Sequence, residues 1–146
     1  MKSLFVYLLY FFFSVFFMSY FPIVETFSPI LFYNLKRGNY TNFWVLGIIA
    51  LAFLEGVSIL RFSIFLPFLF VQYFLFHLIS EFIDFETVVF DAIYFFMVSL
   101  SLFLLIKESQ ILLDIYIKNI NTLLYFLFSF FMYNIFCFVI KKYELT

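Results

Sequence analysis

Charged side chains are scarce in this sequence, at 12% of its 146 residues. A soluble domain devotes roughly a quarter of its residues to Asp, Glu, Lys and Arg, because its surface must be hydrated. A chain this short has a high ratio of surface to volume, so its few charges could not cover a surface in water. The composition therefore excludes an ordinary soluble domain and indicates a chain whose solvent is the lipid bilayer.

Glycine and proline are also rare, with three residues each, and the hydrophobic residues, 67% of the chain, run in long stretches. A transmembrane β-barrel needs segments of roughly 10 residues in which apolar and polar side chains alternate. Here the apolar residues continue without alternation, as in 11–13 and 65–70. Helices are the remaining way to cross a bilayer. We expect an all-α fold, a polytopic membrane helix bundle of about six transmembrane helices, one of them short, in a single integral membrane domain over residues 1–146.

The chain lacks the residue clusters that most chemistry requires. Cys137 is the only cysteine and His77 the only histidine, so neither a disulfide framework nor a zinc site of ordinary spacing is expected. A Gly-rich phosphate loop and a recognisable Ser/His/Asp set are both missing. The eight Lys and Arg are scattered and the net charge is −1, which argues against a nucleic-acid surface. We therefore expect no enzyme, no cofactor, no metal and no nucleic-acid partner.

Polar breaks divide the sequence into apolar segments, which can be compared with the roughly 20 residues that a helix needs to cross the hydrocarbon. The segments that fit are 4–21, 43–60, 62–79, 87–106 and 122–140. The first exceeds the apolar region of a secretory signal and has no small-residue cleavage site, so we expect it to be retained. The segment 22–35 carries Glu25 and Pro29, and it fits a turn near 22–25 followed by a short or tilted helix. The segment 107–121 mixes apolar and charged residues, which predicts an amphipathic helix along the membrane surface.

The distribution of Lys and Arg distinguishes five crossings from six, because short cytoplasmic loops carry an excess of them. Six crossings with a cytoplasmic N-terminus place five basic residues inside and three outside. The inside set is Lys2, Lys36, Arg37, Lys141 and Lys142, and the outside set is Arg61, Lys107 and Lys118. Five crossings would divide them four against four and express no preference. We therefore predict six crossings with both termini cytoplasmic.

Glu55 lies well within an apolar segment, where an ionisable side chain costs about 2.5 kcal/mol or more unless it faces protein or water. Helical spacing places it on one face with small and apolar residues, namely Gly47, Ala50, Leu51, Leu54 and Ser58. Small residues permit close approach of helices, so we interpret this face as a helix-packing or partner face. Two roles stay open for Glu55: a neutral or hydrogen-bonded contact between helices or beside Arg61, and a coupling or ligand site.

A second group of polar residues, His77, Glu81 and Asp91, forms a candidate polar interface. His77 and Glu81 are spaced i, i+4, with Tyr73 one turn earlier, so the three can share a helix face. Such a pair lacks the further ligands of a metal site, and we interpret His77 as an interfacial histidine with hydrogen-bond partners. Asp91 belongs to a polar stripe with Thr87, Tyr94 and Ser101, and a similar stripe in the last span holds Asn121, Tyr125 and Ser129. Stripes of this kind join helices within a bundle.

The pattern over 29–70 resembles that of the MreD family of bacterial rod shape-determining membrane proteins. Members typically carry five or six hydrophobic helices, an arginine-glycine turn after an early short helix, and then a helix with a glycine and an acid. The corresponding residues here are the turn Leu35-Lys36-Arg37-Gly38, Gly47, the triplet Leu54-Glu55-Gly56 and the stretch 58–62. The family usually has Asp where this chain has Glu55.

The resemblance implies a non-catalytic scaffold of the cell-elongation and peptidoglycan-synthesis machinery in the bacterial inner membrane. Its partners would be membrane lipid and an MreC-like protein, and through the latter an actin-like MreB filament and the peptidoglycan synthases. The family fold is also similar to the substrate-binding subunits of energy-coupling-factor transporters. The alternative is therefore a small-molecule-binding transporter subunit, with a pocket lined by groups such as Glu55, Asp91 and Tyr94.

The bias of the basic residues generates a topological prediction. Reporter fusions placed after Lys36 and after Lys142 should both report the cytoplasm, because both positions lie on the side that holds five of the eight Lys and Arg. Activity of a cytoplasmic and of a periplasmic reporter at each site measures this. A periplasmic signal from the fusion after Lys36 would contradict the prediction that the short second segment crosses the membrane.

Overall fold

The computed structural model describes residues 2–20, 25–56, 62–112 and 121–144. Within these ranges the chain forms six α-helices and no strand, which confirms the all-helical class predicted from composition. The helices are α1 (Lys2–Tyr20), α2 (Ser28–Lys36), α3 (Tyr40–Gly56), α4 (Phe62–Ser80), α5 (Val88–Leu112) and α6 (Thr122–Glu144).

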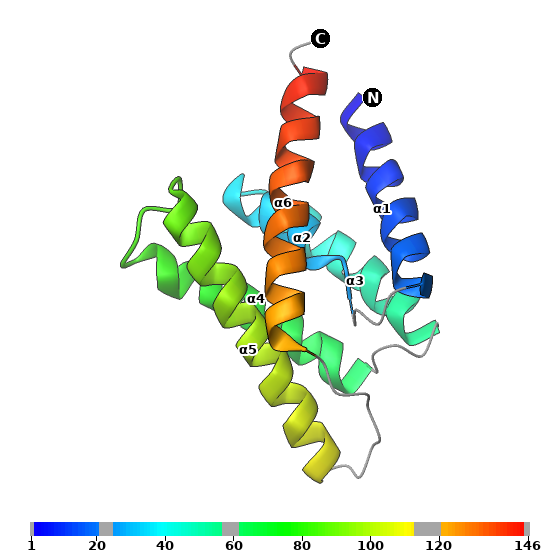
Figure 1. Ribbon diagram of the computed structural model, residues 1–146, viewed down its shortest axis with the longest axis vertical. Coiled ribbons are helices and arrows are strands. Elements are labelled where there is room, and N and C mark those ends of the chain that lie inside the picture. The colour runs from blue at the N-terminus through cyan, green and yellow to red at the C-terminus, as the bar shows by residue number, and fades with distance from the viewer. Residues whose placement is uncertain (1, 21–24, 57–61, 113–120, 145–146) are drawn as a thin grey trace.

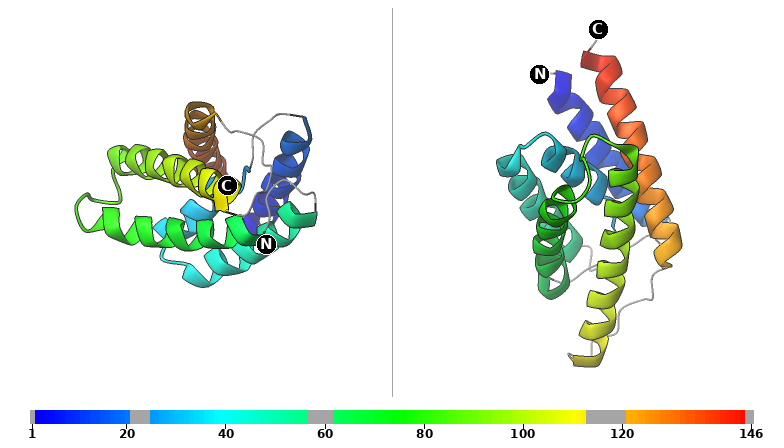
Figure 2. Two further views of the ribbon diagram at one scale, coloured as in Figure 1. Left: turned by 90° about the horizontal axis from the view of Figure 1, so that it is seen from below. Right: turned by 90° about the vertical axis from the view of Figure 1, so that its left-hand side faces the viewer.

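The short helix α2 lies at the centre of the arrangement. It packs against α3 and α6, while α6 also contacts α1 and α5, and α4 contacts α3 and α5. Figure 1 shows α1 and α6 side by side with both chain termini at one end, and α4 and α5 as an inclined helical hairpin. The further views in Figure 2 show the same order, with α3 and α4 on one side and α6 and α1 on the other. Helix α2 is thus enclosed by the longer helices.

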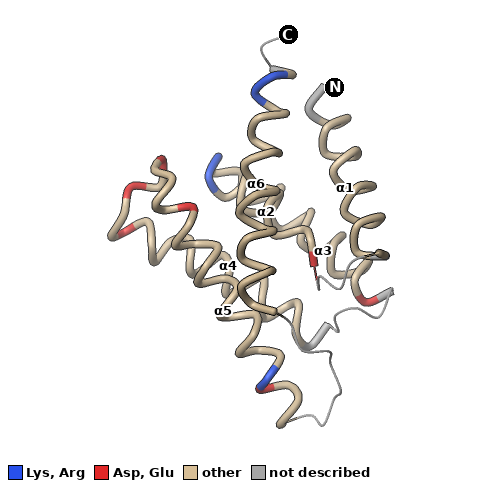
Figure 3. The backbone as a smooth tube through the Cα atoms, in the orientation of Figure 1, with Lys and Arg blue, Asp and Glu red and all other residues tan. Residues whose placement is uncertain are grey.

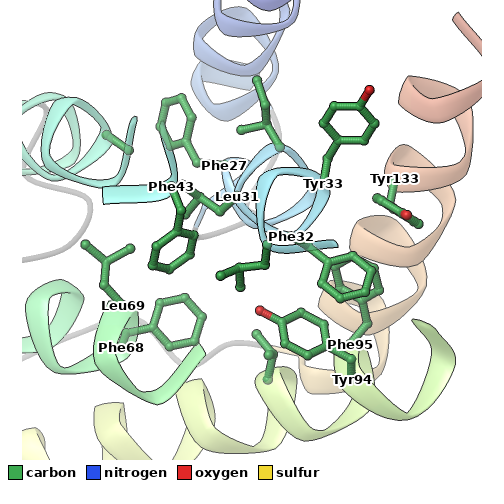
Figure 4. Packing of buried hydrophobic residues seen from close by; sticks show 14 of the residues in the cluster. Phe27, Leu31, Phe32, Tyr33, Phe43, Phe68, Leu69, Tyr94, Phe95 and Tyr133 are labelled. Atoms are coloured by element: carbon green, nitrogen blue, oxygen red, sulfur yellow. The ribbon is translucent and has the colours of Figure 1, made fainter. Parts of the chain in front are cut away.

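Burial of α2 explains why a nine-residue helix is stable here. All its residues from Ser28 to Leu35 are buried. Phe32 stacks on Tyr94 of α5 with ring centroids 4.2 Å apart and meets Phe95 at 4.9 Å and Tyr133 of α6 at 4.8 Å. Figure 4 shows these rings around the α2 backbone. Because an isolated helix of this length is marginal in water, the aromatic packing supplies most of its stability.

Local chemistry sets both ends of α2. Pro29 stands in the first turn, where its missing N–H removes no intrahelical bond. At the other end Gly38 has φ 68°, a left-handed conformation that glycine adopts without steric cost. This turn lets the Asn39 N–H donate to the Asn34 carbonyl at 2.9 Å, and the chain then starts α3 at Tyr40. A polar turn, predicted over 36–42, is therefore present but shorter, because α2 includes Lys36 and α3 begins at Tyr40.

The outer faces of the long helices are apolar. Large exposed hydrophobic residues include Leu8, Phe12 and Phe16 of α1, Ile48 and Ile49 of α3, Phe70 and Phe74 of α4, Leu100 and Leu104 of α5, and Leu127, Phe131 and Phe138 of α6. Figure 3 shows that the charged residues lie mostly at helix ends and connections. A soluble protein of this size rarely exposes contiguous apolar surface on so many elements. The surface fits a lipid environment.

Helix lengths agree with association with a membrane. The segments Val88–Leu112 and Thr122–Tyr143 are long and apolar enough to cross one, and Leu4–Met18, Tyr40–Glu55 and Ile64–Ser80 are shorter apolar helices. Helix α2, with nine residues, is only about 14 Å long and cannot cross a hydrocarbon core of about 30 Å by itself.

Helix α5 is longer than its predicted span over 87–106. It runs for 25 residues to Leu112, so residues 107–112 continue the helix instead of starting a separate amphipathic one. The cause is local: the sequence from Lys107 to Leu112 contains good helix formers and neither glycine nor proline. Residues 113–120 lie outside the described part of the chain. The predicted surface helix over 107–121 is therefore wrong for its first six residues.

The inner face of α3 meets α4 at a close approach. Gly47, Ala50, Leu51 and Leu54 are all buried. A Cβ atom at Gly47 would stand 3.0 Å from both methyl carbons of Leu69, so glycine is what allows the two helices to approach here. The predicted packing role of Gly47, Ala50 and Leu51 agrees with this contact, which is made within the chain.

Replacement of Gly47 by valine should loosen the contact between α3 and α4. We expect Gly47→Val to destabilise the detergent-solubilised protein by about 1–3 kcal/mol, because the branched side chain must displace Leu69. Ala52→Val, on the exposed face of the same helix, is the matched control and should change stability by less than about 0.5 kcal/mol. Thermal or denaturant unfolding measures both. Equal effects of the two variants would contradict the close approach.

Candidate functional site around Glu25

Glu25 is completely buried at the start of α2. Its carboxylate accepts hydrogen bonds from the backbone N–H of Phe27 at 3.0 Å and of Ser28 at 3.1 and 3.2 Å. It also accepts from the Ser28 hydroxyl and from the Tyr125 hydroxyl of α6, the latter at 2.6 Å. Helix N-termini carry unpaired N–H groups and a partial positive charge, which favour an anion at this position. Glu25 therefore caps α2 and joins it to α6.

The hydrogen bonds continue from Glu25 into α4 and α5. The Gln72 amide nitrogen donates to Ser28 Oγ at 3.3 Å, and the Tyr94 hydroxyl donates to Gln72 Oε1 at 3.4 Å. Ser28 Oγ also lies 2.9 Å from Tyr125 Oη. Each donation is directed toward Glu25, so the cluster of Glu25, Ser28, Gln72, Tyr94 and Tyr125 is a polar network with the carboxylate as its final acceptor. We call these five residues the Glu25 cluster.

Helix α1 is connected to the same region. The Tyr10 hydroxyl donates to the Thr26 carbonyl at 2.7 Å, and the Tyr7 hydroxyl donates to Asn34 Oδ1 at 3.2 Å. The Asn34 amide in turn donates to the Ile30 carbonyl at 2.8 Å, within α2. Two tyrosines of α1 therefore hold the outermost helix against α2.

Three buried hydroxyls near this network form no hydrogen bond of good distance and angle among the described residues, although those of Ser14 and Ser129 interact with the Tyr10 and Tyr125 hydroxyls. They are Ser14 Oγ of α1, Thr26 Oγ1 and Ser129 Oγ of α6. Ser14 and Ser129 stand one helical turn after Tyr10 and Tyr125, the tyrosines that reach the segment before α2. Thr26 belongs to that segment itself. Buried hydroxyls usually have partners, so the Thr26 hydroxyl, for which no partner is described, offers a hydrogen bond to water or to a small polar ligand.

The opposite end of α2 is held by an ion pair. Lys36 Nζ lies 2.7 Å from Asp91 Oδ1 of α5, with both side chains largely buried. The ammonium group also stands 5.7 Å from the centre of the Phe32 ring and 5.8 Å from that of Tyr133. A cation at a helix C-terminus is favoured by the helix dipole. Asp91 therefore joins two helices, the role that its polar stripe predicts.

Glu55, the acid that the sequence singles out most strongly, is not in the interior. Its side chain is exposed near the end of α3, whereas Gly47, Ala50 and Leu51 on the predicted common face are buried. Ser58 lies outside the described residues. This exposure argues against a buried contact of Glu55 between helices of this chain, whereas its roles beside Arg61 and toward a partner stay predictions, because Arg61 also lies outside the described residues. Among the described residues, the acids that are buried are Glu25 and Asp91.

His77 and Glu81 are separated by the end of α4. The His77 ring packs against Tyr73 at 4.6 Å, Tyr40 at 5.6 Å and Phe76 at 5.6 Å, which bears out the proximity of Tyr73 and His77. Its Nε2 atom is buried and has no partner among the described residues, contrary to the expected hydrogen bonding. Glu81 is exposed in the turn after Ser80, so it does not share a helix face with His77.

The site residues that sequence reasoning missed are Glu25, Ser28 and Gln72. One signal was available: an acid followed by Ser28-Pro29 is typical of a helix start. Gln72 also interrupts an otherwise apolar span, and polar residues in such spans usually face other helices. In the described part of the chain, no three His, Cys, Asp or Glu side chains gather in an arrangement suited to a metal ion.

Removal of the Glu25 carboxylate should destabilise the bundle strongly. Glu25→Ala leaves the first N–H groups of α2 and the Tyr125 hydroxyl without their acceptor, so we expect a loss of about 3 kcal/mol or more. Tyr125→Phe removes one of these donors and should cost about 1–2 kcal/mol. Glu108→Ala, at an exposed position of α5, is the control and should be close to neutral. Unfolding in detergent tests the order, and a stability of Glu25→Ala equal to that of the control would refute the capping role.

The chain was compared with family models, with curated proteins and with solved structures. No family model, curated protein or solved structure matches the chain.

Proposed function

We propose that this protein is a non-catalytic scaffold of the bacterial inner membrane, similar in role to MreD in the cell-elongation and peptidoglycan-synthesis machinery. The observation that carries the proposal is how the buried polar groups are used. Glu25, Ser28 and Tyr125 bind one another at one end of α2, and Lys36 binds Asp91 at the other. A catalytic site needs a nucleophile or base that can reach a substrate. These groups hold helices together instead.

The outer face of α3 is the proposed surface for a partner helix. Val45, Ile48, Ile49 and Glu55 are all exposed. By helical spacing Val45 and Ile49 lie on the side of α3 away from the Gly47 contact with α4, and Ile48 and Glu55 lie on the flank between the two sides. An ionisable side chain on a face toward lipid is costly unless another group satisfies it. A partner helix that offers a hydrogen-bond donor or a basic residue to Glu55 would cover both the apolar row and the acid. The partner surface therefore keeps Glu55 from the face proposed from sequence, whereas Gly47 of that face contacts Leu69 of α4.

Six crossings with both termini cytoplasmic remain our proposal for the membrane arrangement. It is supported by the path of the chain: the termini, the turn after α2 and the connection between α4 and α5 lie toward one end of the molecule in Figure 1. Helix α2 would return the chain to the side from which α1 started, as a partial crossing enclosed by protein. Non-helical backbone at membrane depth is tolerated when protein surrounds it, and residues 25–27 before α2 are buried.

The proposed partners follow from the scaffold role and from the resemblance to MreD. They are membrane lipid and an MreC-like single-span protein, which would connect the scaffold to an actin-like filament and to peptidoglycan synthases. Gene neighbourhood discriminates this role from transport. Adjacent genes for an actin-like protein and a single-span coiled-coil protein would favour the scaffold, whereas an adjacent pair of ATPase genes would favour a transporter.

One observation favours the alternative, a small-molecule-binding subunit of a transporter of the energy-coupling-factor type. The buried Thr26 hydroxyl has no partner among the described residues and is next to Glu25 in the chain. A small polar ligand could use it. Such a site would involve Glu25 and Tyr125, whereas Glu55 is exposed and Asp91 is paired with Lys36.

Substitutions of Glu55 test the proposed partner surface. Glu55→Gln keeps size and hydrogen bonding and should preserve association with the MreC-like partner, whereas Glu55→Leu should weaken it and Glu55→Lys should weaken it most. The measurement is pull-down of the partner at matched membrane levels of each variant. Glu108→Lys, an exposed acid on α5, is the control and should bind like the parent chain. If Leu and Lys at position 55 also bind like the parent, the outer face of α3 is not the partner surface.

A further inference from the structure

A groove runs between α1 and α6 at the end of the molecule that carries both chain termini. Its volume is about 490 Å³, and its lining comes from three residues of α1 and four of α6. These are Phe5, Val6, Leu9, Phe138, Val139, Lys142 and Tyr143. Figure 1 shows the two helices side by side over this region. The Glu25 cluster does not contribute to the groove.

Aromatic contacts join α1 and α6 in the bundle next to the groove. Phe136 of α6 meets the Tyr10 ring at 5.0 Å and the Tyr7 ring at 5.8 Å, both in edge-on geometry. Tyr10 and Phe136 are buried, whereas the lining residues Phe5, Leu9 and Phe138 are exposed. The groove therefore opens toward the surroundings of the bundle.

Polarity changes along the groove in one direction. Two pairs of lining residues lie one turn apart on the same face of α6. The first pair, Phe138 and Val139, is apolar, and the second pair, Lys142 and Tyr143, brings an ammonium and a phenol group to the end of the helix. Lys141, next to Lys142, is exposed as well. Tyr and Lys are the residues that meet lipid headgroups at the membrane surface. An apolar channel that ends in positive charge is the complement of a lipid with an anionic headgroup.

We propose that this groove binds one anionic phospholipid, with an acyl chain between α1 and α6 and the headgroup phosphate at Lys142. Phe5, Leu9 and Phe138 contact the chain, and the Tyr143 ring lies at the level of the headgroup. A basic side chain near the membrane surface attracts lipids with an anionic headgroup. It attracts a zwitterionic lipid of equal chain length less strongly.

The size of the groove distinguishes a lipid from a helix as its occupant. An α-helix about 10 Å in diameter fills about 420 Å³ per turn of 5.4 Å. A groove of about 490 Å³ thus encloses little more than one helical turn, so a partner helix or a second copy would lie on it with side chains alone, an outcome that the oligomeric state in the test below reports. A single acyl chain is much thinner and can lie along its length. The site is independent of the proposed scaffold role and of the α3 surface.

The test uses the full chain in nanodiscs that contain equal amounts of phosphatidylglycerol and phosphatidylcholine with identical acyl chains. After release into mild detergent, native mass spectrometry counts the lipids of each class that stay bound and reports the oligomeric state. We expect the parent protein to retain one lipid, with phosphatidylglycerol preferred. Lys142→Gln should reduce that preference about fivefold, which corresponds to about 1 kcal/mol.

Matched variants separate the headgroup from the chain. Lys107→Gln removes a charge from α5, at a position that does not line the groove, and should leave the preference unchanged. Val139→Trp fills the groove and should abolish retention of both lipids, whereas Leu127→Trp, an exposed position of α6 that does not line the groove, should retain them.

Three results would overturn the proposal. The first is an unchanged preference for phosphatidylglycerol in Lys142→Gln, which would show that Lys142 does not bind the headgroup. The second is retention of the lipid by Val139→Trp. The third is a parent dimer that Val139→Trp dissociates, because a second copy of the chain would then be the occupant. Equal thermal stability of the parent and of each variant ensures that none of these results reflects unfolding.

Discussion

The capping of α2 by a buried carboxylate is the interaction on which the rest of this fold depends. Glu25 receives two backbone N–H groups at the start of the helix and the Tyr125 hydroxyl from a residue 100 positions later in the chain. A buried carboxylate is tolerated at this place because the backbone N–H groups and the Ser28 and Tyr125 hydroxyls donate hydrogen bonds to its oxygens. Once it is in place, the nine residues of α2 can be surrounded by aromatic side chains, and Phe32 becomes the meeting point of α2, α5 and α6.

The two ends of α2 are held by different chemistry, and together they define its orientation. At the first end hydrogen bonds join Glu25 and Ser28 to α6 and, through Gln72, to α4. At the second end the Lys36 ammonium pairs with Asp91 of α5. A buried ion pair contributes little net stability, but it penalises arrangements that leave either charge alone. Apolar packing alone would allow a short helix to slide or turn, whereas these polar contacts specify one position.

The pattern of the sequence predicted the long helices well, because each is a continuous apolar run between polar breaks. The turn after Leu35 and the close contact at Gly47 were also predictable, since glycine has a local physical meaning at both places. What local pattern could not show is that Glu55 is exposed although Leu51 and Leu54 beside it are buried. Its exposure depends on the neighbours that α3 acquires, which are distant in sequence. Glu25 was likewise visible only as a break, because its partner Tyr125 is distant in sequence.

The direction of the hydrogen bonds in the Glu25 cluster bears on the choice between a scaffold and a transport subunit. Tyr125 and the Ser28 hydroxyl both donate to Glu25, so a ligand that binds the carboxylate must displace at least one of them. Displacement would free the start of α2 and loosen the packing of Phe32 against α5 and α6. A transport subunit could use that movement, since substrate release requires a site that opens. A scaffold gains from the opposite property, because its outer surfaces keep a fixed geometry only while α2 stays in place.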